Sequence, residues 1–212
     1  MHAPTEAPCA DATRRDGPPR EGKIGPNAVT RVAEALREMH GARICRDVFA
    51  AAGLERHLEA APTQMVDESD AARLHRALVE TLGFEPATMV AQRAGALTGD
   101  YLLAHRIPQP AQRLLRLLPR RLAAALLLRA ITRHAWTFAG SGAFSYGFNP
   151  TLRLRLRGAP ICRLVRSEAP ACGYYAATFE RVFAAMLGDS VQVVEMQCEA
   201  QGAPECVFNV SW

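Results

Sequence analysis

The 212-residue sequence lacks any long apolar run, since the longest, from Leu122 to Leu128, has only seven residues. A membrane-spanning helix needs about 20, so we expect no transmembrane segment. The first residues carry prolines and acidic side chains where a secretory signal would be basic and then apolar, which argues against export. Six cysteines in such a chain are expected to be reduced thiols, available for packing, metal binding or chemistry.

Lysine is also nearly absent, and acidic residues are missing altogether between Tyr101 and Ser167, where 12 arginines lie. Residues 1–100 hold 12 basic and 15 acidic side chains, and residues 168–212 hold six acids and one arginine. A basic segment between acidic flanks suits an anionic partner such as nucleic acid, a lipid surface or a carboxylate-bearing ligand. The alternative is that these arginines pair with the acids of the flanks in the folded protein.

Several catalytic motifs are missing as well. The sequence has no Walker loop, H-E-x-x-H pair, EF-hand loop or G-x-S-x-G elbow. Gly140 and Gly142 begin like a dinucleotide-binding loop, but Ser145 takes the place of the third glycine. Nucleic-acid motifs are absent, and the alternating arginines of residues 153–157 are typical of a solvated strand face, so no nucleic-acid partner is expected. The residues alone do not indicate an enzyme.

The apolar pattern predicts an α+β fold in which helices come first and strands follow. Prolines, glycines and charges in residues 1–23 predict a disordered leader, followed by one domain over residues 24–212. Its part over residues 24–133 is helical and its part over residues 134–212 is rich in sheet. Helices are predicted from about residue 27 to Gly41, then over 48–58 with a break at Gly53, 67–82, 86–105, 112–133 and 172–187; strands are predicted over 151–157, 161–165, 191–196 and 207–212.

The strongest local pattern is a set of metal-binding residue types, namely Cys172, Glu195, Cys198 and Cys206. Cys172 opens a predicted helix, and the other two cysteines flank a turn-rich loop. Three thiolates and a carboxylate suit tetrahedral zinc in a structural site, provided that the strand bends near Met196. The alternative is that these cysteines are small buried apolar residues, because no C-x-x-C pair is present. The other cysteines, Cys9, Cys45 and Cys162, are expected to be dispensable for metal.

A second group of residues suits a flat ligand. His134, Trp136 and Phe138 follow the arginine-rich helix, and a histidine beside two large aromatics permits stacking and axial coordination. Tyr101 and His105 lie one helical turn apart and are candidates for the same cavity. The alternative is a core aromatic cluster with a hydrogen-bonded histidine.

The C-terminal region from Cys172-Gly-Tyr-Tyr through Val194-Glu-Met-Gln-Cys198 to Gly202-Ala-Pro-Glu-Cys206 resembles the 4-vinyl-reductase domain family. The segments Tyr101–Pro108 and His134–Gly142 resemble its bacteriochlorophyll-biosynthesis members in purple phototrophs. The resemblance implies a twisted antiparallel sheet covered by helices around an apolar pocket, a fold shared with small-ligand sensors and with Bet3-like vesicle-tethering subunits. It also implies zinc at the four residues named above. The pocket matches only loosely, because the loop from Gly140 to Pro150 has no clear counterpart.

The resemblance further implies a role in bacteriochlorophyll biosynthesis for photosynthesis, with a magnesium tetrapyrrole of the divinyl protochlorophyllide or chlorophyllide type as ligand. Reduction of a vinyl group needs a hydride or electron source, and the sequence carries no motif for one. A substrate carrier or accessory protein is therefore expected, with His134 as candidate axial ligand and Arg106 and Arg133 as candidate partners of a propionate. The alternatives are a 4-vinyl reductase (8-vinyl in the other nomenclature), alone or as a subunit, and a non-enzymatic ligand sensor. A homodimer and contacts with other pathway enzymes stay open, in the cytoplasm or at the periphery of the photosynthetic membrane.

Overall fold

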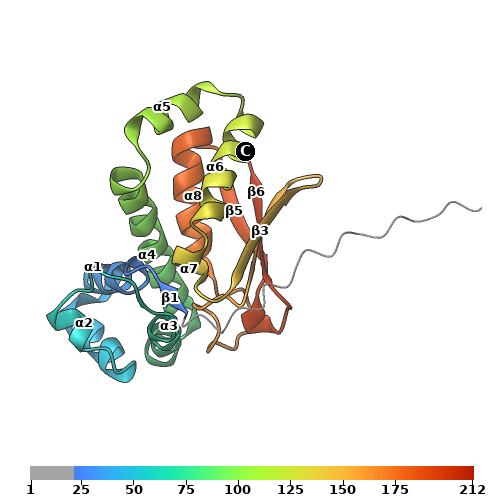
Figure 1. Ribbon diagram of the computed structural model, residues 1–212. Coiled ribbons are helices and arrows are strands. Elements are labelled where there is room, and N and C mark those ends of the chain that lie inside the picture. The colour runs from blue at the N-terminus through green and yellow to red at the C-terminus, as the bar shows by residue number, and fades with distance from the viewer. Residues whose placement is uncertain (1–21) are drawn as a thin grey trace, which may run out of the picture.

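The computed structural model describes residues 22–212, which form an α+β fold with an antiparallel sheet and helices packed against it (Figure 1). The predicted leader up to residue 21, together with Cys9, lies outside the described residues. Within the described part, no helix combines the length and apolar character needed to cross a membrane. The elements in chain order are β1 (Lys23–Ile24), α1 (Asn27–Ala51), α2 (Arg56–Glu59), β2 (Val66–Asp67), α3 (Glu68–Leu82), α4 (Phe84–His105), α5 (Gln109–Leu117), α6 (Arg120–Arg133), α7 (Trp136–Ala139), β3 (Ala143–Phe148), β4 (Leu152–Arg157), α8 (Gly173–Leu187), β5 (Gln192–Gln197), η1 (Glu199–Gln201) and β6 (Cys206–Ser211).

The helical half follows the sequence signals closely. α1 is interrupted at Gly41, whose φ of 82° is accessible to glycine but strained for other residues. The predicted cap of α3 is confirmed, because the Asp67 side chain accepts a hydrogen bond of 2.7 Å from the Ser69 amide. Pro119 caps α6, and Gly83 and Gly188 end α3 and α8.

The main sheet has the strand order β3-β4-β6-β5, with every neighbouring pair antiparallel. β4 shows the alternation read from the sequence, since Leu152, Leu154 and Leu156 are buried while its arginines lie on the other face. β3 and the short α7 were not predicted. The predicted strand over residues 161–165 is wrong, because residues 160–164 form a turn.

α8 lies between the sheet and α4 (Figure 1), and its contact with α4 depends on small residues. A Cβ atom at Gly95 of α4 would lie 2.2 Å from the Tyr174 carbonyl oxygen, so only glycine permits this approach. The Thr178 hydroxyl donates to the Gly95 carbonyl at 3.0 Å, and the Thr98 and Tyr174 hydroxyls are 2.8 Å apart. These bonds satisfy polar groups inside an otherwise apolar helix pair.

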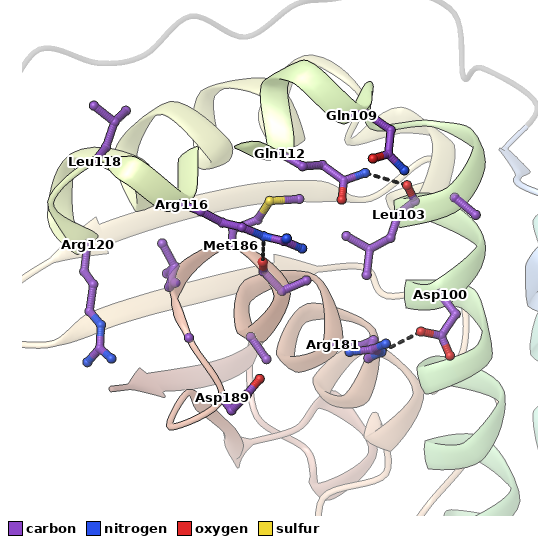
Figure 2. Close-up of a pocket in the computed structure, with 15 residues that line it drawn as sticks. Asp100, Leu103, Gln109, Gln112, Arg116, Leu118, Arg120, Arg181, Met186 and Asp189 are labelled. Atoms are coloured by element: carbon purple, nitrogen blue, oxygen red, sulfur yellow. Dashed lines mark hydrogen bonds and ion pairs between the residues drawn. The ribbon is translucent and has the colours of Figure 1, made fainter. Parts of the chain in front are cut away.

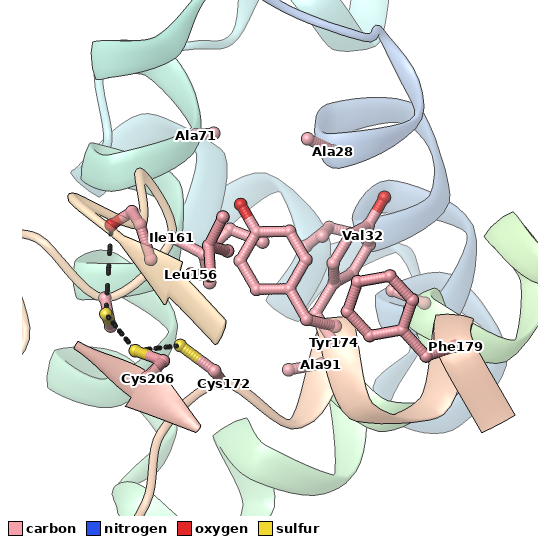
Figure 3. Close-up of a cluster of buried hydrophobic side chains, with 14 of the residues drawn as sticks. Ala28, Val32, Ala71, Ala91, Leu156, Ile161, Cys172, Tyr174, Phe179 and Cys206 are labelled. Carbon is pink, nitrogen blue, oxygen red and sulfur yellow. Dashed lines mark hydrogen bonds between the residues drawn. The ribbon is translucent and has the colours of Figure 1, made fainter. Parts of the chain in front are cut away.

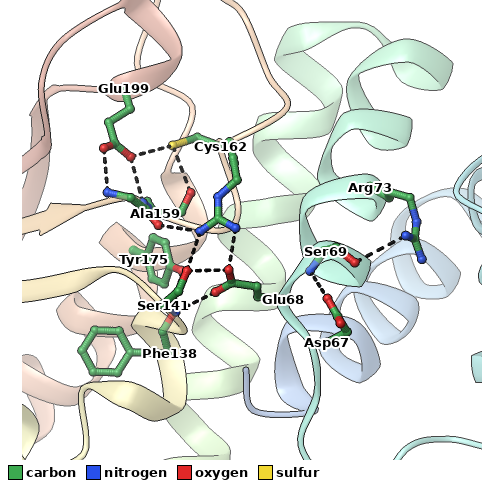
Figure 4. A network of polar contacts seen from close by, with 12 residues as sticks. Asp67, Glu68, Ser69, Arg73, Phe138, Ser141, Ala159, Cys162, Tyr175 and Glu199 are labelled. Atoms are coloured by element: carbon green, nitrogen blue, oxygen red, sulfur yellow. Dashed lines mark hydrogen bonds and ion pairs between the residues drawn. The ribbon is translucent and has the colours of Figure 1, made fainter. Parts of the chain in front are cut away.

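A buried carboxylate joins the two halves of the fold (Figure 4). Glu68, at the start of α3, accepts hydrogen bonds from the Ser141 amide at 2.7 Å and from the Ser141 hydroxyl at 2.5 Å. Arg163, in the turn after β4, forms an ion pair of 2.5 Å with the same carboxylate. Burial opposes ionisation of Glu68, but the bonds from Arg163 and Ser141 prevail and hold its pKa below the ordinary value.

Candidate functional site

Four cysteines that are far apart in the sequence meet beside the sheet. Cys162 lies in the turn after β4, Cys172 caps α8, Cys198 follows β5, and Cys206 begins β6. All four side chains are buried, and their sulfur atoms lie within 4.8 Å of one another. Figure 3 shows Cys172 and Cys206 at the edge of the hydrophobic cluster that contains Tyr174 and Phe179.

The separations between these sulfur atoms suit a tetrahedral metal ion. The Sγ of Cys206 is 3.5 Å from that of Cys172, 3.6 Å from that of Cys162 and 3.8 Å from that of Cys198. Cys172 and Cys198 are 3.9 Å apart. A regular tetrahedron with metal–sulfur bonds of about 2.3 Å has edges of about 3.8 Å. The four cysteines therefore form a group that fits such an ion without rearrangement.

The surrounding backbone supports the sulfur atoms. Glu199 of η1 accepts hydrogen bonds from the amides of Gly158 and Ala159, at 2.7 and 2.8 Å, and so fixes the turn that carries Cys162 (Figure 4). The Glu199 amide points at the Cys206 sulfur at 3.4 Å, and another amide, that of Ala171, points at the Cys198 sulfur at the same distance. Amide donors of this kind stabilise thiolates and orient metal ligands.

The protonation of the group is shared among its members. Hydrogen bonds from Cys162, Cys172 and Cys206 lower the pKa of Cys198, whereas the bond with Cys162 is the main cause that raises the pKa of Cys172. Four buried thiolates would repel one another, so only a bound cation can stabilise them together. The site is therefore suited to hold a thiophilic metal more than to supply a free nucleophile.

Glu195 lies beside this group but is not a member of it. One carboxylate oxygen accepts a hydrogen bond of 2.8 Å from the Cys172 amide, and the other is buried with no hydrogen-bond partner among the described residues. Burial and the neighbouring Cys198 raise the pKa of the Glu195 carboxyl to about 9. The expected bend is present, because the pairing of β5 with β6 is irregular between Glu195 and Gln197. Three of the four predicted ligands are thus brought together, and Glu195 stands at their edge.

Cys162 is the member that the sequence analysis missed, and its position argues against the expectation that it is dispensable. It belongs to no recognisable spacing, and the apolar residues around it were interpreted as a strand. Only the long-range contact with Glu199 brings its turn to the other cysteines. Cys45 is buried elsewhere, in α1, where its thiol lies 3.6 Å from the Ala33 carbonyl oxygen.

The predicted tetrapyrrole residues after α6 lie at the surface and at the edge of the core. His134 is exposed at the end of α6, beside Arg133, and Trp136 is 53% exposed. Phe138 is half-buried, with its ring centroid 5.3 Å from that of Phe144 and 5.8 Å from that of Phe179. Phe138 thus belongs to an aromatic core cluster.

The other predicted tetrapyrrole residues gather at the end of α4. The rings of Tyr101 and His105 are 4.8 Å apart, as their spacing suggested. The guanidinium groups of Arg31 and Arg106 lie 5.1 and 6.0 Å from the Tyr101 ring centroid, within reach of cation–π attraction. The described contacts join these residues with Arg31 of α1, not with His134 or Trp136.

A cavity of about 750 Å³ lies between the end of α4, α5 and the end of α8 (Figure 2). Leu103, Leu118 and Met186 contribute apolar surface, and three arginines lie around it. Arg116 donates to the Ala185 carbonyl at 2.8 Å and Arg181 pairs with Asp100 at 2.5 Å, whereas Arg120 has no ion-pair partner within residues 22–212. None of the seven predicted tetrapyrrole residues lines this cavity.

The fold and the cysteine group place the chain among proteins with a vinyl-4-reductase domain, since the model of this domain matches residues 152–211, which contain all four cysteines. The sequence is 39% identical over 194 residues to the bacteriochlorophyll synthase 23 kDa chain of Cereibacter sphaeroides, with 92% of this chain and 93% of that protein covered. It is 38% identical to the protein of the same description from Rhodobacter capsulatus, with 89% and 86% covered. The chain therefore belongs to the bacteriochlorophyll synthase 23 kDa chain family.

The fold also has a counterpart among solved structures. A structure from a study of haem distortion in the H-NOX family superposes with a TM-score of 0.56, at 11% sequence identity, over 89% of this chain and 95% of that chain. At this identity the similarity concerns the fold alone. It agrees with the α+β class and the helix-covered antiparallel sheet predicted from the sequence.

Proposed function

We propose that this protein binds a magnesium tetrapyrrole of bacteriochlorophyll biosynthesis and delivers it, chemically unchanged, to another enzyme of the pathway. The observation that carries the proposal is the near full-length relationship to two bacteriochlorophyll synthase 23 kDa chains. That relationship assigns the protein to the pathway, and the step within it is inferred from the chemistry of the described residues.

The arrangement around the two glycines favours a carrier over a reductase. In a dinucleotide-binding unit, the glycine-rich turn follows a strand and opens a helix. Here Gly140 and Gly142 follow the short helix α7 and precede the strand β3, which is the reverse order. A vinyl reductase acting alone would need a hydride or electron source at another place. The runner-up function is a reductase, or a subunit of one, that receives reducing equivalents from a partner.

The cavity at the end of α8 is the place in the structure best suited to the pigment. Its volume lies within the range of about 300–1,000 Å³ that small-molecule sites occupy. Leu103, Leu118 and Met186 would contact the macrocycle, and Arg120 would pair with its propionate. Gln109 and Asp189 bring oxygen donors to the lining, and magnesium prefers oxygen ligands. The alternative position is the surface around His134 and Trp136, as the sequence analysis predicts.

We further propose that zinc occupies the four-cysteine group in a structural role. Soft thiolates in a closed tetrahedral set select zinc among the common divalent metals. Bound zinc would hold the turn after β4, the start of α8 and the loop between β5 and β6 together. Cys162 would then complete the set formed by Cys172, Cys198 and Cys206, and the Glu195 carboxyl would hold the Cys172 amide. The alternative set contains Glu195 in place of Cys162.

An absorption titration with magnesium divinyl protochlorophyllide tests the proposed function. We expect a saturable shift of the pigment bands at one pigment per chain. Arg120→Gln should weaken binding, while Arg121→Gln, an exposed neighbour outside the cavity lining, should leave it unchanged. If His134→Ala or Trp136→Ala alters the spectrum and Arg120→Gln does not, the pigment binds at the sequence-predicted position. No saturable shift in the unmodified protein would refute the proposed function.

A further inference from the structure

The outer face of α5 carries apolar side chains in contact with solvent. Leu114 and Leu117 are 57% and 84% exposed, whereas Leu115 between them is buried. Arg113 lies on the same outer face, because residues three or four positions apart share one side of a helix. α5 is thus amphipathic in an unusual sense, since the face turned away from the core combines leucine with arginine.

α6 repeats this arrangement. Leu122 and Leu126 are exposed, and Arg129 and Arg133 continue the same face at helical spacing. The opposite face of α6 is buried and consists of small and apolar residues, namely Ala123, Ala124, Leu127 and Leu128. Figure 1 shows α5 at one end of the molecule, far from α1, α2 and α3.

The arginines of this region are not neutralised by the protein. Seven arginines lie between residues 106 and 133, where the sequence has no acidic residue. Among residues 22–212, the ion pairs that involve the acid-free segment 101–167 are those of Arg155 and Arg163, both outside α5 and α6. Pairing with the acidic flanks therefore does not explain the charge of α5 and α6, and the field of these arginines extends into solvent.

We propose that the outer faces of α5 and α6 bind the surface of an anionic lipid bilayer. Leucines on a basic helix enter the region between headgroups and acyl chains, while arginines bind lipid phosphates and keep their charge at the surface. Leu114, Leu117, Leu122 and Leu126 would enter the bilayer, and Arg113, Arg129 and Arg133 would contact the headgroups. Nucleic acid would match the charge but not the exposed leucines. An acidic protein partner is the other occupant that the test distinguishes.

Flotation of the full chain with vesicles tests this proposal. We expect binding to vesicles of phosphatidylcholine mixed with phosphatidylglycerol, weak binding to phosphatidylcholine alone, and loss of binding at high salt. The double variant Leu114→Ser/Leu117→Ser should reduce the bound fraction by more than about tenfold, because both side chains would lose their burial in the interface. Matched melting temperatures and circular dichroism would show that this surface change leaves the fold intact.

A control double variant, Met39→Ser/Met89→Ser, removes exposed apolar side chains from α1 and α4, away from the proposed face. It should bind the mixed vesicles like the unmodified protein. Equal loss in both double variants, or no loss in Leu114→Ser/Leu117→Ser, would overturn the proposal. An absence of flotation would also overturn it, and self-association that the leucine variant abolishes would identify the face as a contact between proteins.

Discussion

At the scale of single residues, the metal site depends on how the turn after β4 is held. Cys162 reaches the other sulfur atoms because Glu199 binds the two amides that precede it in this turn. A carboxylate that binds backbone amides at 2.7 and 2.8 Å is a strong constraint, since such bonds are charge-assisted. The donor set is therefore fixed by residues from both ends of the vinyl-4-reductase domain.

Replacement of Cys162 separates the two possible ligand sets. Cys162→Ser should lower the zinc content of protein purified without chelator well below one equivalent, because the fourth thiolate is lost. Cys45→Ser removes another buried thiol and should keep the metal, as it lies outside the cluster. Metal analysis by mass spectrometry provides the measurement. Full metal content in Cys162→Ser together with loss in Glu195→Gln would identify Glu195 as the ligand.

Glu68 should make the stability of the protein depend on pH in the acidic range. Because its folded-state pKa lies below the ordinary value of 4.5, ionised Glu68 stabilises the fold above that value. This contribution is lost as the pH falls through the folded-state pKa. Glu68→Gln should therefore lower the melting temperature at neutral pH and reduce its fall on acidification. Thermal unfolding across this pH range measures both effects, and Glu85→Gln, exposed on α4, is the control. Equal pH profiles for Glu68→Gln and unmodified protein would contradict this role.

At the scale of elements, the contact between α4 and α8 places a cysteine ligand and a cavity wall on one helix. The start of α8 carries Cys172, and its end lines the cavity with Met186 and Leu187. The approach of α4 to α8 therefore influences both regions. It depends on Gly95, where the backbone of α8 leaves no space for a side chain.

Gly95→Ala should destabilise the protein by about 1–3 kcal/mol, the usual cost of overpacking a core. The gain in helix propensity from alanine, about 1 kcal/mol, opposes this cost but does not remove the clash with the Tyr174 carbonyl. Chemical denaturation measures the change, with Ala104→Ser at an exposed position of the same helix as the control. A more stable Gly95→Ala variant would show that α4 and α8 separate without cost.

The elements that the sequence predicts well are those with a local signal. Helical spacing and caps such as Asp67 and Pro119 gave the course of α3 and α6, and strict alternation gave β4. The turn over residues 160–164 was missed because its apolar residues suit a strand, whereas the bonds to Glu199 and the ion pair of Arg163 are long-range. The same reason explains the metal site, in which three ligands followed from the sequence and Cys162 did not.

At the scale of the whole molecule, the charge asymmetry of the sequence persists in the fold. The sequence allowed either an anionic partner or internal pairing of the arginines, and α5 and α6 carry arginines without ion pairs to the described acids. The position of the pigment pocket could not be predicted, because a cavity depends on the packing of α4, α5 and α8, which are separated in sequence. The predictions for His134 and Trp136 stay open.

The central claim is that the protein binds the pigment and does not change it. The most direct measurement is gel filtration of the zinc-loaded protein with magnesium divinyl protochlorophyllide and NADPH, followed by mass spectrometry of the pigment that elutes with the protein. The account predicts that pigment and protein elute together and that the pigment retains both vinyl groups. Recovery of pigment heavier by two hydrogen atoms would contradict it and identify the protein as the reductase.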